Sequence, residues 1–184
     1  MESETAATQT FAIAEKFLER SRYFLNNEYL PKIRLAIESV SDEAIWWRAN
    51  ESSNSIGNLM LHLAGNIRQW IVSGVGGAAD VRQRSTEFRA RGGKDKAALL
   101  AYLTAAVRDA DDVLAALIAD ELGHPRQIQG RSTTVFEAVY HVVEHFSTHT
   151  GQIILLAKVH VGDKVKFYDD ADLARALWKE GTRS

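Results

Sequence analysis

The chain has 184 residues, of which 46% are hydrophobic and 25% are charged, and its formal net charge is −2. This balance predicts one globular domain over residues 1–184 and does not favour a nucleic-acid partner, because no excess of positive charge is present. The absence of cysteine excludes disulfides, thiolate ligands and a cysteine nucleophile.

The N-terminal segment MESETAATQT lacks the basic start and apolar centre of a signal peptide. No run reaches the ~18 apolar residues of a membrane span, so we expect a cytoplasmic protein without a membrane partner. A first helix is predicted from about Thr10, because apolar side chains recur three and four residues apart. Pro31 is expected to interrupt or kink this helix.

A second helix is predicted from about Ser55 to the glycine-rich segment that begins at Gly74. One face of this helix is apolar. Another carries a polar stripe that consists of Asn58, His62, Asn66 and Gln69. Such a stripe is equally compatible with a solvated face and with the wall of a polar cavity.

A polar loop is expected over residues 78–93, and it contains Arg82, Arg84, Arg89 and Arg91. Long ordered loops often cover a functional site. Arg82 and Arg84 could therefore hold an anionic substrate, although arginines of a solvated loop commonly have no such role.

The rest of the chain is predicted to be helical except for one connection. A third helix is expected over residues 94–119, followed by a loop over residues 123–133 with a hairpin turn at Gly130. A short terminal helix is expected over residues 169–178. With a fourth long helix before it, the pattern predicts an all-α protein built as a four-helix bundle.

The fourth helix opens with Thr134-Val-Phe-Glu137, the spacing of a capping box, and is expected to run to about His160. It carries a row of histidines four residues apart, namely His141, His145 and His149. Adjacent members lie ~6 Å apart along the axis, whereas nitrogens that share one zinc ion lie within roughly 4 Å of each other. Either adjacent pair can thus bind one ion, but the whole row cannot. The alternative for each histidine is a partly buried ring bonded to backbone or water.

The segments SIGNLMLHLAGNIRQW and HVVEHFSTHTGQI resemble the DinB-like, or YfiT-like, superfamily of metal-dependent hydrolases, and the similarity covers nearly the whole chain. A subgroup of unknown function is the most similar part of that superfamily. The resemblance implies a divalent metal held by His62, His145 and His149, the last two preceding a Gly-Gln pair. The side chains expected to support these ligands or line the pocket are His141, Gln152, Asn66, Arg82 and Arg84.

Three neutral imidazoles leave an ion its charge and an open coordination position, which is typical of catalytic sites. Such an ion can turn water into hydroxide or a thiol into thiolate near neutral pH. The resemblance implies a thiol S-transferase or a hydrolase that acts on a small-molecule substrate. A transferase would also bind a low-molecular-weight thiol as its second substrate. Zinc or nickel is expected, with iron as a further candidate. A metal-binding or protein-interaction bundle without catalysis is the alternative, and no catalytic side chain is assigned.

A homodimer is expected, partly because proteins of this superfamily often pair. The chain also offers large apolar side chains for an interface in Trp46, Trp47, Trp70 and Trp178. Packing in the protein core is the alternative for each of them.

Overall fold

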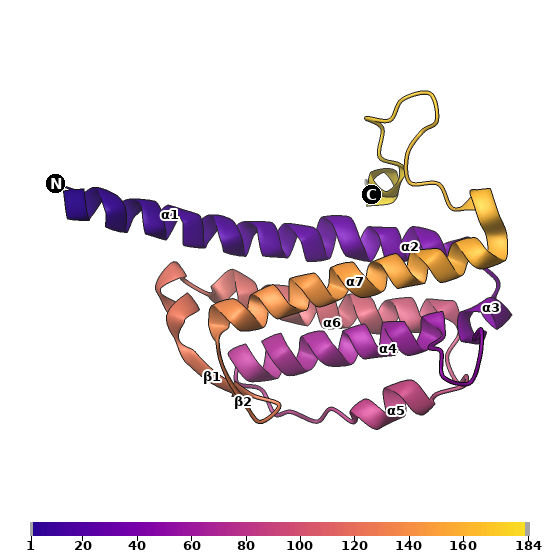
Figure 1. The fold of residues 1–184 in the computed structure, drawn as a ribbon, viewed down its shortest axis with the longest axis horizontal. Coiled ribbons are helices and arrows are strands. Elements are labelled where there is room, and N and C mark those ends of the chain that lie inside the picture. Colours follow the sequence, from indigo (N-terminus) through magenta and orange to yellow (C-terminus); the bar gives the residue numbers. More distant parts are fainter. Residues whose placement is uncertain (1, 183–184) are drawn as a thin grey trace.

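The computed structural model describes residues 2–182 and the side chains of residues 9–179. Most of this part of the chain is helical, with one small sheet of two strands (Figure 1). In chain order, the elements are α1 (Glu2–Tyr23), a π-helical stretch (Phe24–Tyr29), α2 (Leu30–Glu38), α3 (Asp42–Trp46), α4 (Ile56–Ile67), a second π-helical stretch (Arg68–Val75), α5 (Arg84–Arg89), α6 (Lys96–Ala116), β1 (Pro125–Ile128), β2 (Arg131–Thr134) and α7 (Val135–Val161), with short 3₁₀ turns at Ala119–Gly123, Gly162–Lys164 and Leu177–Thr182. No helix among residues 2–182 is long and apolar enough to cross a membrane.

The first helix begins earlier than predicted, at Glu2 rather than near Thr10, and it continues through a π-helical stretch into α2. Pro31 lies in the first turn of α2. Just before it, the Leu30 N–H bonds the Leu25 carbonyl, five residues back. Pro31 therefore does not break the helix. The chain passes through a π-helical stretch just before the proline and continues directly into α2.

The starts of the other long helices follow their capping residues. Ser55 and Asn58 form a reciprocal capping box at the start of α4, and Thr134 and Glu137 form another at the start of α7. The Asp95 side chain accepts a hydrogen bond from the third residue of α6. These caps satisfy backbone N–H groups that have no partner inside the helix.

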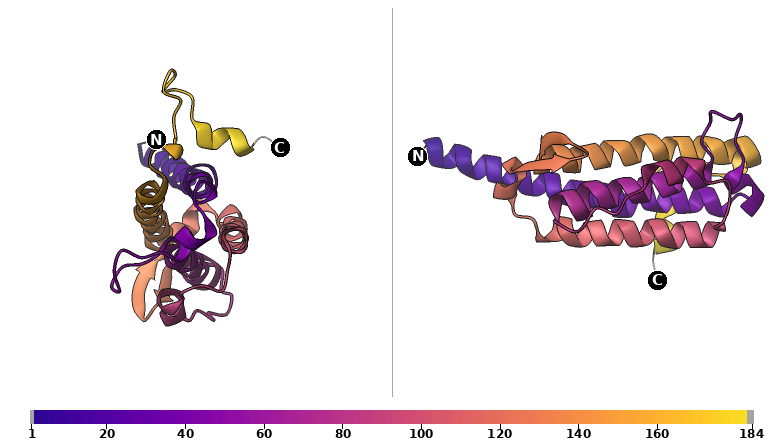
Figure 2. Two further views of the ribbon diagram at one scale, coloured as in Figure 1. Left: turned by 90° about the vertical axis from the view of Figure 1, so that its right-hand side faces the viewer. Right: turned by 90° about the horizontal axis from the view of Figure 1, so that it is seen from below.

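The long helices lie side by side (Figures 1 and 2). The interior between them is apolar. α4 packs against both α6 and α7, and α2 packs on the other side against α7 and α6. Fully buried side chains from all of these helices meet there, among them Ile33, Ile37, Leu63, Ile67, Leu99, Leu103, Val142 and Phe146. The site described below lies between α4 and α7, so this core fixes the spacing of the two helices.

Two segments differ from the prediction. The expected loop over residues 78–93 contains the short helix α5, which lies against α4. The terminal helix expected over residues 169–178 is wrong. The Asp169 and Asp172 carboxylates accept hydrogen bonds from the N–H groups of Ala171 and Ala174, and such local bonds compete with helix formation. The segment is a turn closed by a bridge between Tyr168 and Ala176.

The hairpin expected at Gly130 is present and reaches the site. β1 and β2 pair antiparallel, with Ile128 opposite Arg131. The turn residues Gln129 and Gly130 both have positive φ, at 54° and 72°. Ile128 is buried against Gly74, where a Cβ would lie 2.4 Å from the isoleucine Cδ1, so the hairpin is docked on the end of the second π-helical stretch, which follows α4.

Candidate metal centre

Three histidines from two helices face one another between α4 and α7. His62 comes from α4, and His145 and His149 come from successive turns of α7. One nitrogen from each ring forms a group in which all three atoms lie within 4.8 Å of one another. Nε2 of His62 lies 2.9 Å from Nε2 of His145. This group could hold a metal ion, and the polar stripe of the second helix therefore faces the interior.

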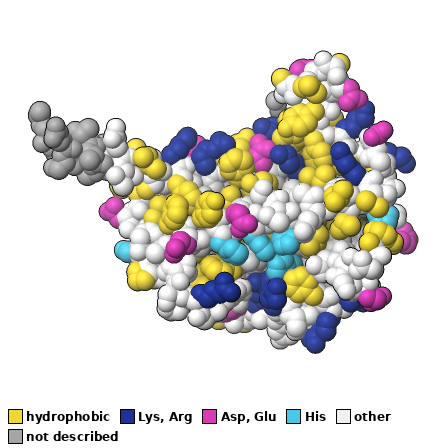
Figure 3. Space-filling model, in the orientation of Figure 1, with side chains coloured by type: hydrophobic (Ala, Val, Ile, Leu, Met, Phe, Trp, Pro, Cys, Tyr) yellow, Lys and Arg dark blue, Asp and Glu magenta, His cyan; other side chains and the backbone are white. Residues whose placement is uncertain are grey.

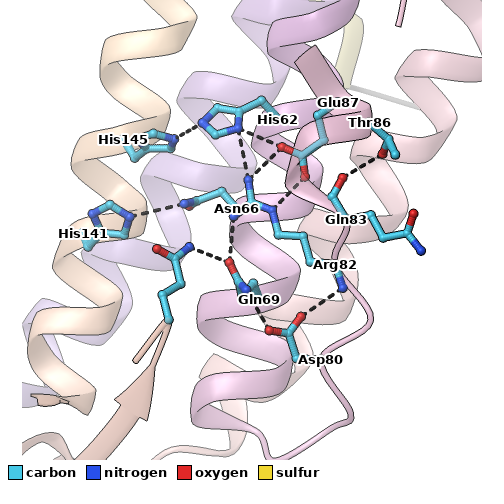
Figure 4. A network of polar contacts seen from close by, with 11 residues as sticks. His62, Asn66, Gln69, Asp80, Arg82, Gln83, Thr86, Glu87, His141 and His145 are labelled. Carbon is cyan, nitrogen blue, oxygen red and sulfur yellow. Dashed lines mark hydrogen bonds and ion pairs between the residues drawn. The ribbon is translucent and has the colours of Figure 1, made fainter. Parts of the chain in front are cut away.

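The hydrogen bonds of His62 determine which of its nitrogens is free. Its Nδ1 lies 2.9 Å from Oε2 of Glu87 and 3.0 Å from Nη2 of Arg82, as Figure 4 shows. The two contacts favour opposite tautomers, because a carboxylate only accepts and an arginine only donates. We assign the proton of Nδ1 to the bond with Glu87, because Nη2 of Arg82 already donates to Oε2 of Glu87 at 2.8 Å and a lone pair on Nδ1 would face the carboxylate charge. The lone pair of His62 is then on Nε2, the atom that faces His145.

His149 is held in the same way from its own helix. Its Nδ1 lies 2.7 Å from Oε1 of Gln152, three residues further along α7. The amide oxygen accepts the Nδ1 proton, which leaves the lone pair of His149 on Nε2. Two of the three rings therefore present Nε2, and in both rings a hydrogen bond at Nδ1 sets this tautomer.

Burial keeps the α7 histidines uncharged. Burial lowers the pKa of His145 to about 3, and the neighbouring rings of His149 and His62 act in the same direction. Burial also lowers the pKa of His141 and of His149 below the ordinary value. These imidazoles are neutral at pH 7, so each ring keeps one nitrogen lone pair and a metal ion would not compete with a second proton on the ring.

A buried ion pair lies behind His62. Arg82 donates from Nε to Oε1 of Glu87 at 2.7 Å and from Nη2 to Oε2 at 2.8 Å. Only 4% of the Arg82 side chain and 9% of the Glu87 side chain are exposed. Burial acts to raise the pKa of Glu87, but the hydrogen bonds from Arg82 and His62 and the charge of Arg82 outweigh it and hold this pKa below the usual value. Glu87 is therefore a carboxylate at neutral pH.

His141 lies one turn outside the group of three. Its Nε2 accepts a hydrogen bond from Nδ2 of Asn66 at 3.2 Å, and its ring centre lies 4.2 Å from that of Trp70. The centre of the His145 ring is 5.2 Å away. Of the two adjacent pairs that the row permits, the structure thus joins His145 and His149 with His62.

Residues 12–169 match the model of a family described as a protein of unknown function, DUF1572. The chain belongs to the DUF1572 family. A comparison with curated proteins gives no match.

The surroundings of the site differ from the predicted loop of free arginines. Arg82 is committed to Glu87, whereas Arg84 is exposed and lies over the ring of Phe88, with 4.9 Å between its Cζ and the ring centre. The Phe88 ring in turn lies 4.7 Å from that of His62. Histidine side chains gather in the middle of one face of this DUF1572 protein, beside side chains of lysine or arginine (Figure 3).

Sequence reasoning missed Glu87. It lies in the segment predicted to be an irregular loop, and nothing marks it among the charged residues nearby. Two features of the sequence could have indicated it. An acidic residue lies close to Arg82, and the segment that contains both is long enough to fold back over the second helix. In this DUF1572 protein that segment forms α5, which places the carboxylate against α4.

Proposed function

We propose that this protein binds one divalent transition metal ion through Nε2 of His62, His145 and His149, on a four-helix bundle of the DinB-like type. The approach of two imidazole Nε2 atoms to 2.9 Å, between helices far apart in the sequence, is the observation that carries the proposal. The hydrogen bonds at Nδ1 of His62 and His149 support it, because they leave both Nε2 atoms free to bind.

The donor set fits a borderline transition metal. Neutral imidazoles suit zinc, nickel and iron, and no thiolate competes because the chain has no cysteine. We propose zinc or nickel ahead of iron. Three protein ligands leave at least one coordination position for another molecule, as in catalytic rather than structural zinc sites.

We further propose that the protein is a metal-dependent enzyme, either a thiol S-transferase or a hydrolase, acting on a small molecule. When bound, such an ion acts as a Lewis acid that makes a thiol or a water molecule nucleophilic near neutral pH. The protein itself supplies the positions of the three rings and the uncharged state of His145 and His149. Because the chain lacks cysteine, the sulfur in the first reaction would come from a small thiol.

The metal content of single variants tests the ligand set. Untagged protein from metal-replete cells should hold about one equivalent of a divalent ion. His62→Ala, His145→Ala and His149→Ala should each lose most of it, while His141→Ala should keep a near-normal stoichiometry. A protein that binds no such ion even after reconstitution would refute the site. Loss in His141→Ala with full occupancy in His149→Ala would show that the other pair binds.

Turnover separates an enzyme from a protein that only binds metal. The metal-loaded protein is assayed with an electrophile and a small thiol, and separately for hydrolysis of ester and amide substrates. We expect turnover in one of the two assays and loss of it in His149→Ala. Turnover in neither assay by fully loaded protein would contradict the enzymatic proposal and leave the metal site standing.

We also infer a homodimer, supported by the superfamily resemblance and by exposed apolar side chains. Trp70 and Trp178 are buried and unavailable for an interface, but Tyr140 and Leu155 of α7 are exposed, as is Ile13 of α1. Light scattering at micromolar concentration should give the mass of two chains. The mass of one chain would refute the dimer.

A further inference from the structure

The carboxylate of Glu87 lies where it can control His62. Glu87, which is 25 residues from His62 along the chain, accepts the Nδ1 proton of His62. This nitrogen is on the side of the ring that faces away from His145. Arg82 holds both oxygens of this carboxylate at once, through Nε and Nη2. A bidentate pair of this kind fixes the plane of the carboxylate as well as its position.

α4 is shaped to receive this ion pair. At Gly65, three residues after His62, an added Cβ would lie 2.1 Å from Oε1 of Glu87 and 2.9 Å from Nε of Arg82. The pair therefore lies directly against the helix backbone, in a space that any larger residue would fill. Glycine in the middle of a helix is less favourable than alanine, so this space has a cost in helix stability.

The arginine is also held on its outer side. Nη1 of Arg82 donates to Oε1 of Gln69 at 2.9 Å, and Nε2 of Gln69 donates to Asp80. Gln129, at the tip of the hairpin, donates to the same oxygen of Gln69. Each nitrogen of the guanidinium thus has an acceptor, and the chain of contacts runs from the hairpin to the ring of His62 (Figure 4).

A buried ion pair is a poor source of stability, because removing two charges from water offsets most of their attraction. Orientation of a ligand is a better account of this one. Histidines that bind metals usually donate their other N–H to a carboxylate or carbonyl, which fixes the tautomer and the ring. We propose that Glu87 and Arg82 are positioning residues, in which Glu87 directs Nε2 of His62 at the metal and Arg82 holds Glu87. This inference rests on the proposed metal site.

Metal affinity, measured by competition with a chelator, tests the pair without removing a ligand. Glu87→Gln keeps the shape of the side chain, but it replaces one of the two oxygens that accept from the Arg82 guanidinium with an NH₂ group that cannot accept. Gly65→Ala adds one methyl group, which displaces the Glu87–Arg82 pair from the helix. Both should weaken binding by ~10–100-fold, the usual effect of such supporting groups. The matched control is Gly151→Ala on α7, where an added Cβ meets nothing within 4 Å. It should leave the affinity within about twofold.

The tautomer of His62 gives a readout that does not depend on metal. In the metal-free wild type, ¹⁵N NMR should show a protonated Nδ1 and an unprotonated Nε2, and Glu87→Gln should shift this balance toward the other tautomer. An Nε2-protonated His62 in the wild type would overturn the proposal even if both variants failed to fold.

The two failures are distinguishable. Unchanged affinity in both Glu87→Gln and Gly65→Ala, with a wild type that binds metal, would overturn the positioning role and leave the metal site intact. A wild type that binds no metal, but whose His62 tautomer responds to Glu87→Gln, would refute the metal site and support the control of the ring by Glu87.

Discussion

Gln152 and Glu87 accept the same kind of proton from two different rings, but they do so in different surroundings. Glu87 is buried and charged, whereas Gln152 is exposed and neutral. Water can replace an exposed amide oxygen as the acceptor for His149, and hydrogen bonds to a charged group are roughly twice as strong as neutral ones. The two supporting groups should therefore contribute unequally to metal binding.

We predict that Gln152→Ala weakens metal binding by less than about tenfold, and by less than Glu87→Gln does. The measurement is the same chelator competition on both variants. A control is Ser147→Ala, which alters an exposed, uncharged residue of α7. A loss in Gln152→Ala as large as in Glu87→Gln would show that exposure does not decide the contribution.

The sequence could predict those parts of the site that depend on the helical period. The helical period predicted that one adjacent pair of the row could share an ion, but it did not distinguish His141 and His145 from His145 and His149. The choice of the second pair came from the resemblance. His62 was ambiguous from the polar stripe and was implied only by the resemblance. Glu87 was not predictable, because its position depends on how the segment after α4 folds back onto Gly65.

At the scale of elements, an ion pair joins two helices remote in sequence. Arg22 of α1 donates from Nε and Nη2 to the two carboxylate oxygens of Asp111 in α6, at 2.8 and 2.9 Å. The bond from Arg22 lowers the pKa of Asp111 against the opposing effect of burial. Asn26 donates to the same carboxylate at 2.9 Å.

Asp111→Asn should lower the free energy of unfolding at pH 7 by at most about 1 kcal/mol, because the pair is partly exposed and screened. A carboxyl whose folded pKa is depressed stabilises the fold above its unfolded pKa, about 3.9 for aspartate, and this contribution disappears as pH falls through the folded value. Urea unfolding at pH 7 and at acid pH measures the loss of stability in the variant and its dependence on pH. The difference between the wild type and Asp111→Asn should shrink below about pH 4.

The exposed neighbour Asp112 is the control for this pair. Asp112→Asn removes the same charge from the same helix, but without the bidentate bond to Arg22. It should change the free energy of unfolding by less than Asp111→Asn at pH 7. Equal effects would assign the stabilisation to net charge rather than to contact between α1 and α6.

Elements with local start signals were predictable, and those made by tertiary contacts were not. The capping box at Thr134 placed the start of α7 within a residue, and the start predicted near Ser55 agrees with that of α4 to within a residue. α5 has no side-chain cap and spans only Arg84–Arg89, so its helical form depends on its packing against α4. The C-terminal segment was misassigned because the aspartates that close its turns also suit the first turn of a helix.

At the scale of the whole molecule, the site joins the second and the last long helix. His62 and His145 are 83 residues apart, and the buried core between α4 and α7 holds them together. In an unfolded chain the three ligands would be dispersed, so a metal bound at this site favours the folded state over the unfolded one. Metal binding should therefore raise the free energy of unfolding of the whole domain.

We predict that adding metal to chelator-stripped protein raises the melting temperature. At a free metal concentration of 100 times the Kd, the stabilisation is about 2.7 kcal/mol, which for a chain of this length corresponds to roughly 5–10 °C. His62→Ala should lose this shift, because one of the two helices no longer contributes a ligand. His124→Ala, an exposed residue next to the hairpin, should retain it. Scanning calorimetry with and without metal measures the shift. An equal shift in the wild type and His62→Ala would mean that the metal stabilises the fold from another place, and the three-histidine site would then be wrong.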